Sequence, residues 1–133
     1  MATVLNPYLG FTNNCRDAMA FYQSVLGGDL EVLTFAEGGM GSDSEKADLV
    51  MHSSLTTPAG FTLMASDDSQ EPATGDALSI SLSGDEPDAL RTYWQKLSDG
   101  AEIIVPLEKA PWGDYFGMLR DRFGIRWLVN FAE

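Results

Sequence analysis

The only histidine of the 133-residue chain, His52, is the side chain best suited to acid–base chemistry. It lies in a β-type run, Leu49 to Leu55, so its ring points to one of the two faces of a sheet. An imidazole can act as a general acid, a general base or a hydrogen-bonding group for a ligand. The alternative is a structural histidine satisfied by a backbone carbonyl. We take His52 as the candidate catalytic residue, with both interpretations open.

A second candidate for chemistry is Cys15, which falls in the first turn of an expected helix beside Arg16. This position can lower the pKa of a thiol and increase its reactivity. Nucleophilic catalysis also needs a base in space, and none lies near in the sequence, so a packed, inert thiol is the alternative. As the only cysteine, it excludes an intramolecular disulfide and a thiolate metal cluster within one chain.

Aromatic and acidic side chains gather at Trp112, Asp114 and Tyr115, between the glycines Gly113 and Gly117. They are expected where a loop enters a strand near the mouth of a pocket. Aromatic rings with one carboxylate suit the binding of a flat or cationic ligand. A turn that packs Trp112 against the sheet is the alternative.

Alternation along the first and last expected strands supplies further candidates, because every second side chain points to the same face. One face is expected to line the pocket and bind the ligand, with a single arginine as its cationic group; its members are Leu9, Phe11, Arg126, Leu128 and Asn130. The other face is expected to pack under the helices; its members are Tyr8, Trp127 and Val129.

The elements that would position these residues follow one order twice. In the first half, a short strand at 6–11 precedes a helix that starts at Asn13-Asn14 and ends at Leu26 before Gly27-Gly28. Strands are then expected at 30–35, 49–56 and 61–65. In the second half, a strand at 78–83 precedes a helix capped by Asp85 with Pro87 in its first turn, and strands follow at 102–105, 114–120 and 125–131.

The two halves also keep a common spacing of 72 positions. It separates Phe21 from Tyr93, Gly28 from Gly100 and Val32 from Ile104. The spacing indicates an internal duplication. We therefore expect an α+β fold of two βαβββ modules that form a partly closed mixed β-barrel, with module 1 at about 1–72 and module 2 at about 73–133 of a single domain. Its concave side could hold a ligand.

Charge and hydropathy limit the classes of partner that the protein could bind. The net charge of −12 and the lack of a Lys or Arg cluster argue against nucleic acid. Acidic residues gather at 43–48, 67–76 and 85–88, which is typical of a solvated surface, although they could also steer a cationic ligand. No apolar run approaches the roughly 18 residues that span a bilayer, and residues 1–6 do not resemble a signal peptide. We expect a cytoplasmic protein with no membrane partner.

Three segments resemble a known family. The run Asn14–Tyr22, continued to Gly28, is similar to the first-helix signature of the vicinal oxygen chelate superfamily, which includes glyoxalases, bleomycin resistance proteins and dioxygenases. Three features resemble the PhnB-like subgroup, whose domain is labelled a 3-demethylubiquinone-9 3-methyltransferase. They are the Asn-Cys start of this run, His52 followed by 61–67, and the stretch 111–127. The resemblance implies paired βαβββ modules, a pocket in the cupped sheet and a homodimer.

Metal-dependent members of this superfamily place His, Gln or Glu ligands on the strands that open and close the modules. The corresponding positions here hold Pro7, Ala77 or Ser79, and Leu128. A divalent metal prefers at least three good ligands. Because these positions lack the family's ligand residues, we predict that the metal site is lost and that no cofactor is bound. A divalent metal at other positions stays possible.

Three functions remain in competition. The first is a small-molecule binder, or an enzyme that uses His52 in place of a metal. The second is a metal-dependent lyase or dioxygenase in which His52 meets two carboxylates, for example Glu31 and Glu102. The third is an antibiotic-sequestering resistance protein whose acidic dimer captures a cationic drug. Methyl transfer has the least support, because no glycine-rich cofactor loop is found.

Overall fold

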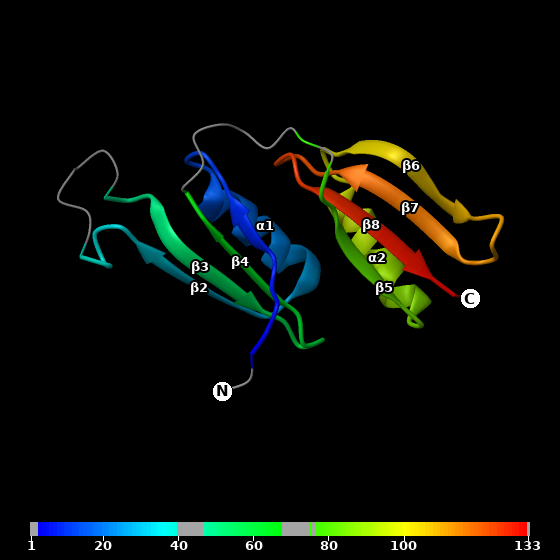
Figure 1. Cartoon of the computed structure of the whole chain (residues 1–133), viewed down its shortest axis with the longest axis horizontal. Coiled ribbons are helices and arrows are strands. Elements are labelled where there is room, and N and C mark those ends of the chain that lie inside the picture. Colours follow the sequence, from blue (N-terminus) through cyan, green and yellow to red (C-terminus); the bar gives the residue numbers. More distant parts are fainter. Residues whose placement is uncertain (1–2, 40–46, 68–74, 76, 133) are drawn as a thin grey trace. The chain divides into compact units, whose positions relative to one another are not determined.

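The computed structural model describes residues 3–39, 47–67, 75 and 77–132. The elements of the first half are β1 (Tyr8–Gly10), α1 (Cys15–Leu26), β2 (Asp29–Thr34), β3 (Val50–Thr56) and β4 (Thr62–Ser66). Those of the second half are β5 (Ile80–Gly84), α2 (Pro87–Leu97), β6 (Glu102–Lys109), β7 (Tyr115–Arg120) and β8 (Arg126–Phe131). Each half thus has the order βαβββ, and the α+β class expected from the sequence is confirmed (Figure 1).

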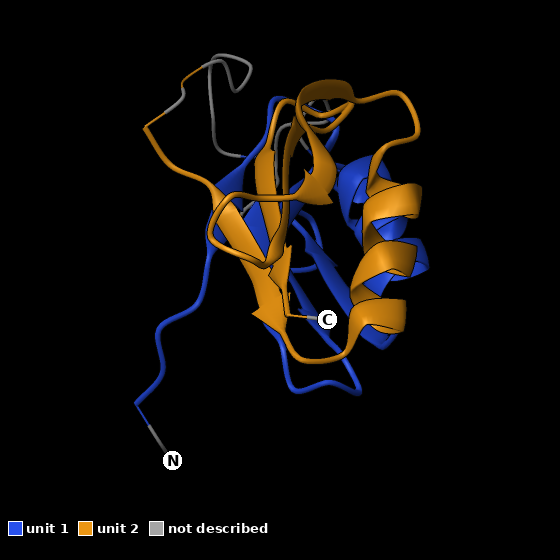
Figure 2. Cartoon of the chain, turned by 90° about the vertical axis from the view of Figure 1, so that its right-hand side faces the viewer, with its two compact units in different colours: residues 1–72 blue, residues 73–133 orange. Residues whose placement is uncertain are grey.

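The chain divides into two compact units, residues 1–72 and 73–133 (Figure 2). Each unit contains one four-stranded mixed sheet and one helix, which lies on one face of that sheet. The pairing of the modules into a barrel and their union in a single domain stay predictions.

The two sheets share one topology. In unit 1 the strand order is β1-β4-β3-β2, with β1 parallel to β4 and the other neighbours antiparallel. In unit 2 the order is β5-β8-β7-β6, again with one parallel pair, β5 and β8. The helix carries the chain from the first strand to the opposite edge of the sheet, and hairpins then return it. The first and last strands of each module therefore become neighbours.

Helix α1 buries one side against the sheet of unit 1. Its buried residues are Cys15, Ala18, Met19, Tyr22, Val25 and Leu26, at the three- and four-residue spacing of an amphipathic helix. Cys15 is fully buried, with its Sγ atom 3.6 Å from Ser53 Oγ of β3. The packed thiol anticipated as the alternative is what the structure shows.

The start of α1 is held by Asp67, which follows β4. One carboxylate oxygen accepts the backbone N–H groups of Asn13 and Cys15, both at 2.9 Å. The other accepts the N–H of Val50, also at 2.9 Å. Asn14 occupies the N-cap position without a side-chain cap bond of its own. Asp67 therefore satisfies donors at a helix start that has no local cap and ties the helix to the first residue of β3.

The start of α2 differs from our expectation, because the N-cap residue is Glu86 and not Asp85. Pro87 is the first helical residue, and its fixed φ defines the start without a side-chain cap. The helix ends at Leu97, where the N–H of Ser98 donates to the Trp94 carbonyl at 2.9 Å.

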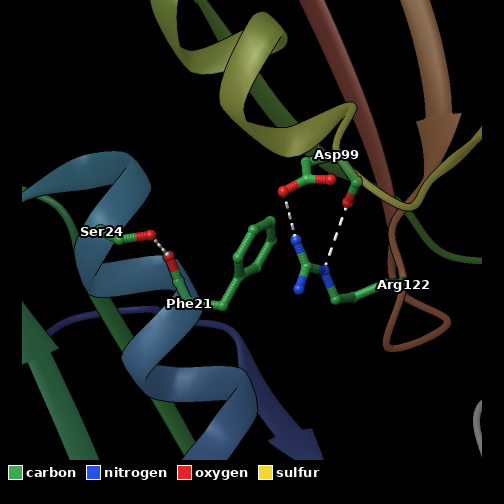
Figure 3. A network of polar contacts seen from close by, with 4 residues as sticks. All are labelled: Phe21, Ser24, Asp99 and Arg122. Atoms are coloured by element: carbon green, nitrogen blue, oxygen red, sulfur yellow. Dashed lines mark hydrogen bonds and ion pairs between the residues drawn. The ribbon is translucent and has the colours of Figure 1, made fainter.

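Polar side chains also form contacts within α1 and at the end of α2, as the close-up shows (Figure 3). In α1, the Ser24 hydroxyl donates to the Phe21 carbonyl at 2.6 Å. In unit 2, Arg122 contacts the Asp99 carboxylate at 2.8 Å and donates to the Asp99 carbonyl at 3.2 Å. The turn between β7 and β8 is thereby joined to the end of α2.

In the described part of the chain, neither helix is long and apolar enough to cross a membrane. Most of the acidic stretches 43–48 and 67–76 fall outside the described residues.

Candidate functional site

The two faces of the sheet in unit 1 are identified by their contacts with α1. Ser53 faces the helix, because its hydroxyl lies beside Cys15. Ala65 is the cross-strand partner of Ser53, and Leu9 is the partner of Ala65. Partners directly opposite one another point to the same side. Leu9 therefore points toward the helix.

This result corrects the facing that we expected for the first strand. Leu9 and Phe11 do not lie on the uncovered face; Phe11 is only 3% exposed. Tyr8, which we expected under the helix, is 50% exposed and pairs with Met64 on the opposite side. The physical reason is that Leu9 and Phe11, which have no polar side-chain atoms, pack into the core, whereas Tyr8 keeps its hydroxyl at a polar surface.

We call the side of each sheet that its helix does not cover the open face. In unit 1 it includes residues from four different strands: Tyr8, Glu31, His52, Ser54 and Met64. The row that fixes this assignment consists of three cross-strand partners, Tyr8, Met64 and Ser54, followed by Glu31 on β2. His52 lies two residues from Ser54 and so shares its face.

His52 and Tyr8 form a pair on this face, although 44 residues separate them in the sequence. Tyr8 Oη lies 2.9 Å from His52 Nδ1, and the two rings are stacked with centroids 5.7 Å apart. The alternative of a histidine held by a backbone carbonyl is not the contact that we observe at Nδ1. Sequence reasoning missed the pair because it placed Tyr8 on the wrong face.

The helix-covered face of unit 2 is marked by Gly117. A Cβ atom at this glycine would come within 2.8 Å of the Trp94 ring of α2. Tyr115, two residues earlier on β7, shares that face: its ring stacks on Phe131 with centroids 5.4 Å apart, and the Arg91 guanidinium lies 4.8 Å from its centroid. Tyr115 is thus on the opposite side from Phe116, which corrects its expected place beside Trp112 and Asp114 near the mouth of a pocket.

The open face of unit 2 contains the residues that we expected on the last strand. Trp127 and Val129 are 1% and 0% exposed, which confirms that this side of β8 packs inward. Their neighbours are half-buried on the open face and pair there with residues of β7; the members include Phe116, Met118, Arg126, Leu128 and Asn130. Arg120 is the cross-strand partner of Arg126, so this face has two arginines and not the single one that we expected. Arg126 donates to the Met118 sulfur at 2.7 Å.

Trp112 and Asp114 each contact one member of this open face. Trp112, 64% exposed, meets Phe116 edge to face with ring centroids 5.6 Å apart. Asp114 accepts a hydrogen bond of 3.2 Å from the Asn130 amide. An exposed aromatic ring thus lies close in the chain to a carboxylate with a fixed orientation. Phe116 belongs to the candidate site as well, and sequence reasoning did not single it out.

One carboxyl group outside these faces has a perturbed pKa. The pKa of Glu37 is lowered mainly by the backbone N–H of Thr34, which donates to it at 3.0 Å, then by the Thr34 hydroxyl and by the charge of Arg16. The N–H of Glu37 in turn donates to the Thr34 hydroxyl at 3.1 Å. This reciprocal contact orders the turn after β2.

Within the described residues, the available side chains do not form a donor set that fits a divalent metal. Among residues 3–39, 47–67, 75 and 77–132, no three His, Cys, Asp or Glu side chains come close enough together to hold an ion. Glu31 shares the open face of His52, whereas Glu102, the other carboxylate considered above, belongs to the other unit.

Comparisons with known proteins agree with this architecture. The family model described as "Glyoxalase/Bleomycin resistance protein/Dioxygenase superfamily" matches residues 4–129. Protein YjdN of Escherichia coli K12 is 26% identical over 97% of this chain and 95% of its own length. The crystal structure of PA1353 from Pseudomonas aeruginosa has a TM-score of 0.83 at 35% identity and covers 98% of both chains.

A second solved structure is that of a Bacillus cereus protein named "Putative 3-demethylubiquinone-9 3-methyltransferase, PhnB protein". It has a TM-score of 0.75 at 25% identity and covers 98% of this chain and 100% of its own. The expected similarity to PhnB-like proteins is thereby confirmed.

Proposed function

The chain belongs to the glyoxalase/bleomycin resistance protein/dioxygenase superfamily, and from that premise we propose that it binds a small organic ligand on the open faces of its sheets without a resident metal ion. The observation that carries the proposal is the contrast between the two sides of each sheet. One side is a buried helix-packed core, and the other is a half-buried to exposed mixture of aromatic, apolar, acidic and hydrogen-bonding side chains. Ligand sites in proteins have this mixed character.

In unit 1 the proposal assigns the polar contact to His52, as a hydrogen-bonding group or a proton-transfer group. In unit 2 it assigns ligand contact to the open-face residues and the loop beside them: Trp112, Asp114, Arg126, Leu128 and Asn130. Leu9, Phe11 and Tyr115 are no longer among them, because they lie on the helix-covered side.

Metal analysis of the purified protein tests the metal-independent part. After expression with added Ni, Zn, Mn and Fe, we expect substoichiometric metal, because three convergent ligands are absent from the described residues. One tightly bound ion per chain that is lost in His52→Ala would overturn the proposal in favour of a metal-dependent lyase or dioxygenase.

Fragment binding tests the location. A library of small aromatic and carbonyl compounds is titrated while backbone amide NMR signals are followed. We expect the largest shifts at open-face residues, and weaker binding to unit 2 in Trp112→Ala. The matched control is Phe61→Ala, which removes an exposed aromatic ring in unit 1. Shifts confined to helix surfaces would contradict the proposal.

Antibiotic sequestration is a second candidate function. Its support is the exposed ring of Trp112 close to the Asp114 carboxylate, together with the net charge of −12. A cationic aromatic drug would meet both an aromatic face and a negative potential. Expression should then protect cells without consuming the drug, and unchanged drug sensitivity would argue against it.

We also propose that the protein is a homodimer, as its resemblance to the superfamily implies, and that it lies in the cytoplasm. Sedimentation velocity measures the oligomeric state: a mass of about twice 14.5 kDa is expected. A monomer at all accessible concentrations would contradict it.

A further inference from the structure

The hydrogen bond between Tyr8 and His52 restricts which atoms the histidine can offer to a ligand. A neutral imidazole carries one N–H and one acceptor nitrogen. The ring nitrogen 2.9 Å from Tyr8 Oη is Nδ1. Whichever role Nδ1 takes in this contact, Nε2 takes the other.

The chemistry of the two groups sets the direction of the bond. A phenol hydroxyl is a good donor, and an unprotonated ring nitrogen is a better acceptor than a phenol oxygen. The arrangement with Tyr8 as donor and Nδ1 as acceptor is therefore favoured, which puts the histidine proton on Nε2. The stacked rings, inclined by 30°, limit rotation of the imidazole and so fix the direction of Nε2–H.

We propose that Tyr8 is a positioning residue that holds His52 as the Nε2–H tautomer, so that the open face of unit 1 binds ligands through an uncharged carbonyl oxygen. This inference rests on the proposed function, because it specifies the chemistry of the same face. Tyr8 acts through His52 and need not touch the ligand.

Charge on the same face decides between a neutral and an anionic acceptor. Glu31 is the cross-strand partner of Ser54, and Asp29 is the partner of Thr56, so both carboxylates share the face of His52. Together with the net charge of −12, they repel a ligand carboxylate. A ketone, ester or amide oxygen accepts the same hydrogen bond without this repulsion.

The side chains around the pair suit such a ligand. Met64 lies in the same cross-strand row as Tyr8 and offers an adaptable apolar contact. Ser54, half-buried beside it, adds a small hydroxyl group. The face therefore combines one oriented donor with an apolar contact at Met64.

The first test reads the tautomer directly. Because His52 is the only histidine, a long-range ¹H–¹⁵N NMR spectrum contains a single imidazole spin system. At a pH where the ring is neutral, we expect protonated Nε2 and a hydrogen-bonded Nδ1. In Tyr8→Phe, the Nδ1 signal should move to the position of a nitrogen without a hydrogen bond. Tyr93→Phe, which removes a hydroxyl from α2 in the other unit, is the matched control and should change neither signal.

The second test uses three probes of similar size: acetophenone, benzoate and benzylamine. We expect only acetophenone to perturb the Nε2–H signal, and its affinity to fall about 2- to 10-fold in Tyr8→Phe, the effect of weakening one neutral hydrogen bond. Tyr93→Phe should bind acetophenone like the unmodified protein.

The outcomes separate this inference from the proposed function. A proton on Nδ1 in the unmodified protein, an unchanged Nδ1 signal in Tyr8→Phe, or preferred binding of benzoate or benzylamine at His52 would overturn the inference while ligand binding stands. Failure of every probe and fragment to bind either open face would overturn the proposed function and with it the carbonyl specificity. The spectra of the ligand-free protein would then still decide whether Tyr8 fixes the tautomer.

Discussion

Replacing Asp67 by alanine is expected to destabilise unit 1 by roughly 2–5 kcal/mol, because one side chain satisfies three backbone donors. The N–H groups of Asn13, Cys15 and Val50 each donate to it at 2.9 Å. A single hydrogen bond to a charged group contributes about 1.5–3 kcal/mol, but the three share one carboxylate and are not additive. Partial exposure reduces the sum further, since water can reach some of the released donors.

A second variant separates the roles of the two carboxylate oxygens of Asp67. In Asp67→Asn, the amide oxygen can still accept from Asn13 and Cys15, while the amide nitrogen cannot accept from Val50. An intermediate loss of about 1–3 kcal/mol is expected, the cost of one unsatisfied donor. Asp29→Asn, at an exposed position of β2, is the matched control and should change stability by less than about 0.5 kcal/mol.

Urea denaturation followed by circular dichroism measures the total loss, and amide hydrogen exchange assigns it to residues. Exchange at Cys15 and Val50 should accelerate together in Asp67→Ala, whereas in Asp67→Asn only the Val50 amide should lose protection. A loss below about 1 kcal/mol in Asp67→Ala, or unchanged exchange at both amides, would refute the argument. The His52 NMR signal should also shift in Asp67→Ala, because Val50 begins the strand that carries the histidine.

Two further predictions concern the same unit. Gly28→Ala should lower the free energy of unfolding in urea by more than about 3 kcal/mol, since φ is +101° and the new Cβ would overlap the Thr56 carbonyl oxygen. Gly60→Ala, with φ of +93° and open space around the new Cβ, should lower it by only about 1 to 2 kcal/mol. Equal losses in the two variants would contradict the packing argument. Because the pKa of Glu37 is lowered in the folded state, its carboxylate stabilises the fold above its unfolded pKa, and this contribution is lost as pH falls through the folded value. Thr34→Val, which removes one of the two donors, should raise the pKa of Glu37 in an NMR titration, and no change would show that the hydroxyl has no part in the shift.

The repeat in the sequence predicted the beginning of each module well. The helices begin at Cys15 and Pro87, and the first strands at Tyr8 and Ile80, with the 72-residue spacing found before. The spacing fails after the second strand, because β3 begins at residue 50 and β7 at residue 115, only 65 positions later. Surface loops tolerate changes in length at little cost, whereas a helix packed on its sheet does not. Sequence spacing therefore holds where packing is tight.

The candidate site could be predicted only in part, because strand facing depends on pairing between distant residues. For β8 the apolar alternation is strong, and Trp127 and Val129 pack inward as expected. Strand β1 has only three residues, with Tyr8 and Leu9 both apolar enough for either side. Its facing is decided by its parallel pairing with β4, and local sequence contains no record of that register.

The same pairing explains why the two modules offer different chemistry on equivalent sheets. At the spacing of 72, Tyr8 corresponds to Ile80; yet Tyr8 pairs with Met64 on the open face, whereas Ile80 pairs with Trp127 on the helix-covered face. The first strands of the two modules are thus out of step by one residue, and a one-residue shift reverses the side to which every side chain points. Ser81, not Ile80, occupies the open face of unit 2, opposite Leu128. The open face of unit 1 thus has Tyr8 beside His52, whereas the first strand of unit 2 places Ser81 on its open face. We therefore expect proton transfer in unit 1 and aromatic contact with a ligand in unit 2.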